Sequence, residues 1–279
     1  MIYLRVKNNT FSLSGCKTLA KNNRDNISAI RKLSSGIRIN YAADDASGLG
    51  LSEKMRSQKR GLKQGSRNSQ DGICLVQTIE GATTEVQDIL HRMTTLATQA
   101  SNGTLVDEDR QEVDKEVQQL KEEINRIAND TEYNGKKVLD GSYGSTGEKL
   151  DIQVGENPGV IISFKPIESI DCDSLKIKNL SVATEGDAKK ALSAIEGAIS
   201  EVSSRRVDLG AVQNRIEHSI KTVDNTEENM AASESRIRDT NMAYESMKSV
   251  KSSILMEATE SMLVQSNNRP DYVLKLLKG

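Results

Sequence analysis

Apolar residues recur at alternating steps of three and four along three long stretches of this chain. The runs are Ile79, Ala82, Val86, Ile89, Met93, Leu96 and Ala100, then Val113, Val117, Leu120, Ile124 and Ile127, and finally Leu192, Ile195, Ile199, Val202, Leu209, Val212, Ile216, Ile220 and Val223. This period places one narrow apolar stripe on each helix, which predicts helices packed side by side as in a coiled coil. Such a fold is typical of proteins that assemble or span rather than of enzymes.

The composition excludes several functional classes. Charged residues make up 28% of the chain, yet the formal net charge is only -2, so the basic face that a phosphate backbone requires is missing. No run of 18 or more apolar residues occurs. We therefore expect neither nucleic-acid binding nor membrane insertion.

The residues that usually carry metal or redox chemistry are scattered. Cys16, Cys74 and Cys172 lie far apart, and neither His91 nor His218 has a second ligand at metal-binding spacing. No arrangement of a nucleophile and a base is recognisable. The sequence predicts no metal, no cofactor and no enzymatic activity.

The N-terminal part predicts a short helix followed by a long one. The short helix covers residues 17–40, with one face formed by Leu19, Ile27, Ile30 and Leu33. Gly36 suits its C-terminal cap, because glycine readily takes the left-handed conformation, and a break follows through residues 37–40. The long helix starts at Asp44 and Asp45, whose carboxylates stabilise the amides of a first turn. It continues to about Ser101, with interruptions at Gly61, Gly65 and Gly72.

The character of the chain changes after Asn102-Gly103, which predicts a turn, and Asp107 is the expected N-cap of the next helix. Residues 150–154, 160–164 and 175–182 predict two or three short antiparallel strands. The last helix is expected from near residue 185 to about residue 267, with Pro270 ending it.

A stripe on so long a helix needs a partner of matching length, which the N-terminal helical half provides. The predicted fold is therefore mainly α: a long antiparallel coiled-coil-like bundle of N- and C-terminal segments, with a small β-hairpin region in the middle. The outermost segments, about 1–40 and 240–279, have little else to pack on. Since isolated helices are marginal in water, we expect these ends to be frayed in the monomer and ordered only on assembly.

Short blocks of sequence carry a more specific signal than the periodicity does. They are Lys32–Asn40, Ala43–Gly48, Ser66–Asn68, Gln70–Gly72, Glu132–Lys137, Leu209–Arg215 and Ala232–Asp239. In this order the blocks closely resemble bacterial flagellins. The residues that the resemblance assigns to the family signature and to subunit packing are Leu33, Ser34, Ser35, Gly36, Arg38, Asn40, Asp44, Asp45, Gly48, Asn68, Asp71, Gly72, Asn214, Arg215, Arg236 and Arg238.

The resemblance implies a domain layout. Residues 1–42 and 240–279 would form the two halves of an inner coiled-coil domain that is disordered in the monomer. Residues 43–135 and 185–239 would supply the helices of an outer helical domain, with 136–184 as its β-hairpin region. The short middle indicates a short form with little or no variable outer domain.

The same resemblance implies a structural subunit that polymerises with copies of itself into the bacterial flagellar filament for motility. It implies export by the flagellar type III apparatus with an export chaperone and without a cleaved signal peptide. Addition would occur beneath a filament cap, next to junction proteins, in the extracellular flagellum. The alternative is a flagellin-like hook–filament junction protein, which usually has a longer middle. A signalling or adhesin coiled coil does not predict the block at residues 36–48, and an enzyme is the weakest alternative.

Some flagellins are detected by a host Toll-like receptor through a patch on the outer helical domain. The resemblance places this patch at Arg92, Leu96 and Glu123, although Thr94 and Thr95 stand where the family usually has an Arg-Glu pair. The alternative interpretation is that these are ordinary solvent or subunit-contact residues.

Both ends of the chain depart from the family pattern. The first sixteen residues are atypical, and the C-terminal end adds charges at Glu257, Glu260, Arg269, Asp271, Lys275 and Lys278. Because charges in a tightly packed tube are costly unless paired or hydrated, a minor or poorly polymerising flagellin is one interpretation. The loop residues Ser142, Ser145 and Thr146 are candidates for O-linked sugars.

Overall fold

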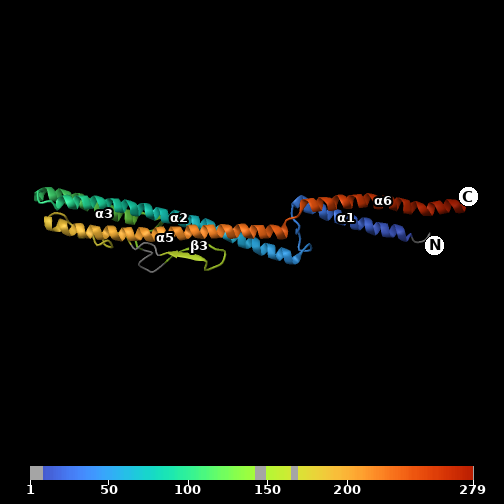
Figure 1. Ribbon diagram of the computed structural model, residues 1–279, viewed down its shortest axis with the longest axis horizontal. Coiled ribbons are helices and arrows are strands. Elements are labelled where there is room, and N and C mark those ends of the chain that lie inside the picture. The colour runs from blue at the N-terminus through green and yellow to red at the C-terminus, as the bar shows by residue number, and fades with distance from the viewer. Residues whose placement is uncertain (1–8, 142–148, 165–168, 279) are drawn as a thin grey trace. The chain divides into compact units, whose positions relative to one another are not determined.

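The computed structural model describes residues 9–141, 149–164 and 169–278 (Figure 1). Residues 1–8 of the atypical start and the candidate sugar sites at residues 142, 145 and 146 lie outside the described residues. The chain divides into two compact units. We call residues 1–57 with 229–279 the terminal unit, and residues 58–228 the central unit. Each unit combines segments from both halves of the sequence, as the predicted antiparallel pairing requires.

Long helices account for most of the described chain (Figure 1). They are α1 (Thr10–Ser35), α2 (Ala46–Ala100), α3 (Asp107–Asp130), α5 (Glu185–Arg238) and α6 (Met242–Lys278). The mainly α prediction is confirmed. The expected interruptions of the long helix at its glycines are wrong, because α2 runs through all three without a break.

The prediction of one helix from residue 185 to 267 is wrong, because α5 ends at Arg238 and α6 begins at Met242. At the break, the backbone N–H of Thr240 donates to the carbonyl oxygen of Gly36 at 3.0 Å, so this segment pairs with another part of the chain. The side chain of Asn241 then accepts the N–H of Tyr244 at 3.2 Å and starts α6 as an N-cap. Pro270 does not end the helix either, since it lies inside α6.

The start of α3 also differs from the prediction. Val106, not Asp107, is the N-cap, and it makes no side-chain capping hydrogen bond. The carboxylate of Asp107 instead pairs with buried Arg110 at 2.7 Å. The same guanidinium donates to the carbonyl oxygens of Ala100 and Asn102, each at 3.0 Å, and so satisfies the C-terminal end of α2.

Two antiparallel hairpins form the β structure of the described residues. In the first, β1 (Glu132–Tyr133) pairs with β2 (Lys136–Lys137), and Asn134 and Gly135 between them take positive φ of 52° and 73°. In the second, β3 (Leu150–Gln153) pairs with β4 (Ile161–Phe164). This second pair confirms two of the three expected strands.

The third expected strand, residues 175–182, does not form. Side chains of α3 bind its backbone instead: the Nζ of Lys121 donates to the carbonyl oxygens of Lys178 and Leu180, and Val182 donates its N–H to Asp114 at 2.7 Å. Since these backbone groups already have partners, no neighbouring strand is needed to satisfy them. We call residues 175–182, which lie along α3, the strap.

The hydrophobic core lies in the central unit, where the predicted stripes of α2, α3 and α5 meet. Buried stripe residues include Val86, Met93, Leu96, Val117, Ile124, Ile195, Val202 and Ile216. The two longest helices run antiparallel here, because Ser66 donates to Asp224 at 3.0 Å and Arg206 donates to Gln87 at 2.6 Å. The coiled-coil prediction is confirmed for this unit.

Candidate subunit-contact site

Most of the signature residues lie at one place, the junction, which we define as residues 33–56 and 233–241. At its start, Gly36 takes φ 69° and donates its N–H to Lys32 at 2.9 Å, which is the predicted left-handed cap of α1. The amide of Asn40 then donates to the hydroxyl of Ser35 at 2.9 Å and to the carbonyl oxygen of Ile37 at 3.3 Å. These local bonds hold the loop in a single turn.

Arg38 connects this loop to the end of α5. Its backbone N–H donates to the carbonyl oxygen of Arg238 at 2.6 Å, next to an antiparallel bridge between Ile37 and Asp239. Its guanidinium donates to the carbonyl oxygen of Ile237 at 2.6 Å. The last carbonyls of a helix have no partner within the helix, and Arg38 satisfies two of them.

Two adjacent carboxylates organise the start of α2. Asp44 accepts the N–H groups of Asn40 and Tyr41, each at 3.1 Å, and Asp45 accepts the N–H of Gly48 at 2.9 Å. The N–H of Tyr41 lowers the pKa of the Asp44 carboxyl, and the N–H of Gly48 lowers that of Asp45. Both acids therefore remain ionised at neutral pH, as the sequence predicts for a helix start.

Gly48 is required here by close packing. A Cβ at this position would overlap the carboxylate of Asp45 and lie 2.9 Å from the Cδ1 of Ile39, contacts that real Cβ atoms do not make. Ile39 is one of two buried apolar side chains among the described residues of the terminal unit, the other being Ala29. The glycine thus lets the loop place its isoleucine against α2.

An ion network joins α2 to α5 at the junction. Glu53 accepts hydrogen bonds from Arg238 at 2.8 Å and from Arg56 at 2.9 Å, and Arg56 also lies 3.5 Å from Glu234. These two guanidinium groups, Arg238 first, lower the pKa of the Glu53 carboxyl. The sequence points to Arg238 but not to its acidic partner Glu53, because the two residues are far apart in the chain.

Three other signature residues have minor roles in the junction. Leu33 is half-buried, Ser34 is exposed, and Arg236 is exposed and donates to Ser233 of its own helix at 3.2 Å. Asn214 and Arg215 are exposed in the central unit. These two residues of α5 thus lie on an exposed helix face, away from the bonded junction.

Asn68 and Gly72 belong to a contact between α2 and the second hairpin. A Cβ at Gly72 would lie 2.5 Å from the Cδ1 of Ile152, and one at Gly65 would overlap the carbonyl oxygen of Val154. Between these glycines, the amide of Asn68 donates to the carbonyl oxygen of Gln153 at 3.1 Å. The glycines form the face on which β3 lies. Asp71, next to this face, accepts through its carbonyl oxygen the hydroxyl of Tyr133 at 3.3 Å.

The pairing of α1 with α6 has an unusual seam. Half-buried or buried residues recur at steps of three and four on both helices, and we call this set the seam: Gly15, Leu19, Asn22, Asn26, Ala29 and Leu33 of α1, with Glu245, Ser249, Ser252, Met256, Thr259, Leu263 and Ser266 of α6. Most of these are small or polar. The expectation that Ile27 and Ile30 share the packed face with Leu19 and Leu33 is wrong, since both isoleucines are more than half exposed.

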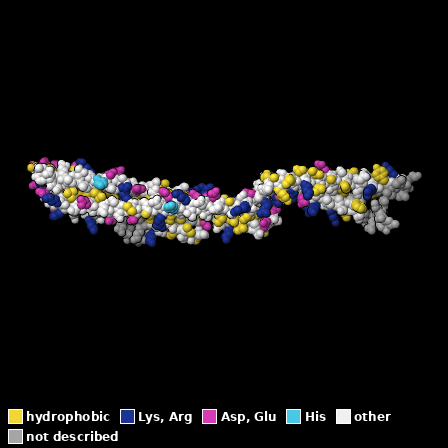
Figure 2. Space-filling model, in the orientation of Figure 1, with side chains coloured by type: hydrophobic (Ala, Val, Ile, Leu, Met, Phe, Trp, Pro, Cys, Tyr) yellow, Lys and Arg dark blue, Asp and Glu magenta, His cyan; other side chains and the backbone are white. Residues whose placement is uncertain are grey.

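Most large apolar side chains of the terminal unit are exposed instead (Figure 2). The exposed set on α1, α6 and the junction is Phe11, Leu13, Ile27, Ile30, Tyr41, Leu51, Met242, Tyr244, Met247, Val250, Ile254, Leu255, Met262, Val264 and Tyr272. In the described central unit, the exposed large apolar residues are only Val106, Val160, Ile161 and Val207. We call the first set the outer apolar face. An apolar surface of this extent marks an interaction site.

The three residues of the expected receptor patch are not equivalent. Leu96 is 3% exposed and belongs to the core of the central unit. Arg92 is exposed and pairs with Glu116 of α3 at 2.7 Å, and Glu123 lies two turns further along α3, paired with Arg126. The structure thus places Arg92 and Glu123, but not Leu96, where a partner reaches them.

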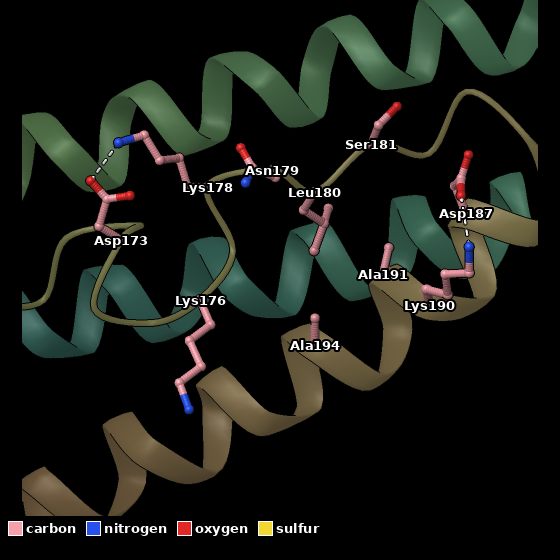
Figure 3. A pocket seen from close by; sticks show the side chains of 10 residues that line it. All are labelled: Asp173, Lys176, Lys178, Asn179, Leu180, Ser181, Asp187, Lys190, Ala191 and Ala194. Atoms are coloured by element: carbon pink, nitrogen blue, oxygen red, sulfur yellow. Dashed lines mark hydrogen bonds and ion pairs between the residues drawn. The ribbon is translucent and has the colours of Figure 1, made fainter.

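The strap also borders a groove of about 590 Å³ at the start of α5 (Figure 3). Two of the lysines that line it are neutralised, because Lys178 lies 2.7 Å from Asp173 and Lys190 lies 3.4 Å from Asp187. The polar residues of α3 that bind the strap, or Cys172 just before it, were not predicted: Asp114, Gln118 and Lys121 bind the strap, and Asn125 binds Cys172. Their spacing of four, three and four was the available signal, since it puts all of them on one helix face.

Within the described residues, no group of three His, Cys, Asp or Glu side chains is arranged to hold a metal ion. None of the described helices combines the length and the apolarity that crossing a bilayer takes. Cys16 and Cys74 are exposed, and Cys172 is buried, where it donates to the carbonyl oxygen of Lys121.

Comparisons with known proteins agree with the signature blocks. Family models match at residues 6–144, for the bacterial flagellin N-terminal helical region, and at residues 192–277, for the C-terminal helical region. A flagellin of Halalkalibacterium halodurans is 44% identical over 98% of this chain and 99% of its own length. A flagellar filament 31.3 kDa core protein of Treponema maltophilum is 38% identical, covering 98% of this chain and 99% of its own. The crystal structure of Bacillus cereus flagellin matches with a TM-score of 0.50 and 34% identity, over 60% of this chain and 94% of that one.

Proposed function

This chain belongs to the bacterial flagellin family and is a structural subunit of the flagellar filament, and we propose that its terminal unit completes its hydrophobic core among neighbouring copies. The flagellin and the filament core protein match this chain over nearly its full length, and the segment between its helical halves is short. Both facts favour the filament subunit over the junction protein. The filament is an extracellular appendage.

The observation that carries the proposal is the contrast between the two units. The central unit buries its apolar stripes internally, whereas in the described terminal unit only Ala29 and Ile39 are buried apolar residues. The outer apolar face therefore has no cover within one chain. Val250 and Ile254, one turn apart on α6, are 59% and 60% exposed. Burying such side chains against another copy stabilises the assembly by about 1.5–3 kcal/mol each.

The energetics explain why order in the terminal unit would depend on assembly. Fixing the backbone costs roughly 1–2 kcal/mol per residue, and the seam buries too little apolar surface to offset that cost alone. We assign residues 1–42 and 240–279 to the inner domain of the filament and residues 43–239 to the outer domain. Assembly then adds the missing apolar burial, and growth needs a nucleus because a lone copy lacks it.

Family membership supports further proposals about partners. The chain would leave the cell through the flagellar export apparatus with the help of an export chaperone, and it would meet the filament cap and junction proteins outside. Its role is structural, without catalytic activity of its own. The frayed terminal unit suits passage through a narrow export channel, because little packing has to be broken.

Detection by a host Toll-like receptor is a second proposal, and it now rests on Arg92 and Glu123 because Leu96 is buried. The guanidinium and the carboxylate are accessible on neighbouring helices of the central unit. A receptor reporter assay with the purified monomer tests it. Arg92→Ala should lower the signal while Arg60→Ala, another exposed arginine of α2, leaves it unchanged.

Seeded filament growth, followed by electron microscopy, tests the main proposal. The double variant Val250→Asp with Ile254→Asp should fail to extend filaments, because two carboxylates would be desolvated at the copy-to-copy contact. Its central unit should unfold at the unchanged temperature in the monomer. Val207→Asp makes the same chemical change at an isolated exposed valine of the central unit and should still allow growth. Normal growth of the double variant, or equal loss with Val207→Asp, would contradict the proposal.

A further inference from the structure

The contacts between α1 and α6 include hydrogen bonds and an ion pair, which depend on direction and distance. Just outside the outer end of the seam Ser12 donates to exposed Asn267 at 2.9 Å, and in the middle of the seam Ser249 donates to Asn26 at 2.9 Å. At its inner end Lys32 lies 3.8 Å from Glu245. Polar pairs therefore occur at three levels of one antiparallel helix pair.

Other polar residues of the seam, together with the paired Glu245, are among the most buried of the terminal unit. Asn22, Ser252 and Glu245 are 9%, 6% and 5% exposed, whereas the outward Ile27 and Ile254 are more than half exposed. An apolar residue in the seam and a polar one outside would stabilise a lone chain better. The observed arrangement is the reverse, so the seam gives up stability of the single chain.

Apolar contacts between helices do not specify register, because a slip of seven residues restores nearly the same burial. Hydrogen bonds require a defined distance and angle, so a slipped pair leaves buried polar groups without partners. A buried asparagine in a helix seam is a known means of fixing register at a cost in stability. The seam has two asparagines, Asn22 and Asn26, and α6 places serine, threonine and glutamate side chains along the rest of it.

We propose that the polar seam is the specificity element that sets the register of α1 against α6 within one copy. A slip of either helix would rotate and displace the outer apolar face relative to the junction, where Thr240 and Gly36 fix the chain. The seam therefore determines which apolar side chains stand next to each other when copies meet. This inference rests on the proposed function, because it assigns the outer apolar face to copy-to-copy contacts.

Disulfide trapping in the soluble chain measures the register directly, because a cross-link captures the terminal helices whenever they pair transiently. The background carries Cys16→Ser and Cys74→Ser, which remove the exposed thiols, and keeps buried Cys172. One reporter is Leu19→Cys with Thr259→Cys, two half-buried seam positions in the observed register. Two slipped reporters combine Leu19→Cys with Ser252→Cys or with Ser266→Cys, one heptad away in either direction.

Each reporter is oxidised with glutathione disulfide, and intramolecular cross-links are quantified. The native reporter should cross-link roughly tenfold faster than either slipped one, the ratio expected when one or two net hydrogen bonds are lost. In a chain that also carries Asn22→Leu and Asn26→Leu, a slipped reporter should approach the rate of the native one. Asn23→Leu, at the neighbouring exposed asparagine, is the matched control and should keep the original ratio.

Two results would overturn the inference. One is that, in the chain with the natural seam, all three reporters cross-link at the same rate or none of them cross-links. The other is an unchanged ratio in the leucine variant, which would mean that apolar contacts or the junction set the register. Filament growth by the unmodified chain is scored separately, so a chain that grows without this register preference removes the inference alone.

Discussion

The carbonyl oxygen of Gly36 accepts a hydrogen bond from the backbone N–H of Thr240 at 3.0 Å. This bond joins the segment that follows α1 to the segment that precedes α6. Together with the bond from the N–H of Arg38 to the carbonyl oxygen of Arg238, it gives the two segments two backbone hydrogen bonds. The left-handed conformation of Gly36 aims its carbonyl group toward the second segment. The backbone geometry of Gly36 therefore contributes to the pairing of the two ends, beside the hydrogen bonds of Arg38.

Replacing Gly36 with alanine should destabilise the terminal unit. The added Cβ meets no atom within 4 Å, so the cost is backbone strain at φ 69°, about 1 kcal/mol. Gly50→Ala is the matched control, because Gly50 lies inside α2 in equally open space and should gain roughly 0.5–1 kcal/mol. Depolymerisation temperatures of filaments should shift down for the first variant and up for the second. Shifts of the same sign would contradict this account of the cap.

Gly65→Ala should destabilise the central unit by displacing β3 from α2. The new Cβ would overlap the carbonyl oxygen of Val154, and overpacking against backbone costs about 1–3 kcal/mol. Gly81→Ala, on the same helix in open space, should be neutral or stabilising. Urea unfolding of the monomer followed by circular dichroism measures both. A Gly65→Ala monomer as stable as the unmodified chain would show that the hairpin does not pack on the glycine face.

Acid should loosen the junction before it unfolds the central unit. Hydrogen bonds from Gly48 and from Arg238 lower the folded-state pKa of Asp45 and Glu53, respectively, below their unfolded values. A lowered pKa adds stability above the unfolded value, and that stability is lost as the pH falls through the folded one. Filament depolymerisation temperature should therefore stay level down to about pH 4 and fall below it.

Asp45→Asn tests this pH dependence, because an amide accepts the same N–H without titrating. The variant should be less stable at pH 7 and should lose part of the acid-dependent fall. Asp88→Asn, at an exposed acid of the central unit, serves as the control. If both variants keep the full fall, the junction carboxylates are not its source.

Cys172 should react far more slowly than Cys16 and Cys74 in the folded monomer. Burial raises the pKa of the Cys172 thiol to about 11, so only about one thiol in a thousand is ionised at pH 8. Iodoacetamide should therefore alkylate Cys16 and Cys74 in the native monomer and leave Cys172 intact, as mass spectrometry of peptides would show. In urea all three should react alike. Native labelling of Cys172 at the rate of Cys74 would contradict its burial.

Sequence periodicity predicted the helices of the central unit because their stripes are buried within the same chain. It failed for α1, where Ile27 and Ile30 resemble core residues but face outward. Periodicity identifies a face that is covered, and it does not say whether the cover comes from the same chain or from another copy. The strand prediction for residues 175–182 failed for a related reason. The alternating apolar residues there are covered, but side chains such as Lys121, rather than a neighbouring strand, bind the backbone.

The junction shows the same division between local and distant information. The cap at Gly36 and the acids at the start of α2 were predicted, because they act on backbone groups within a few residues. The bonds from Arg38 to Ile237 and from Arg238 to Glu53 were not predicted, because the two residues of each pair are distant in sequence. The helix break at residues 239–241 went unnoticed because it depends on the bond from Thr240 to Gly36.

Hydrogen–deuterium exchange of the monomer and of the filament, compared segment by segment, tests most directly whether the terminal unit gains its core from other copies. Amides of residues 10–35 and 242–270 should exchange rapidly in the monomer and become protected in the filament, while α2, α3 and α5 of the central unit stay protected in both. Full protection of the terminal helices in the monomer, or rapid exchange that persists in the filament, would contradict the claim.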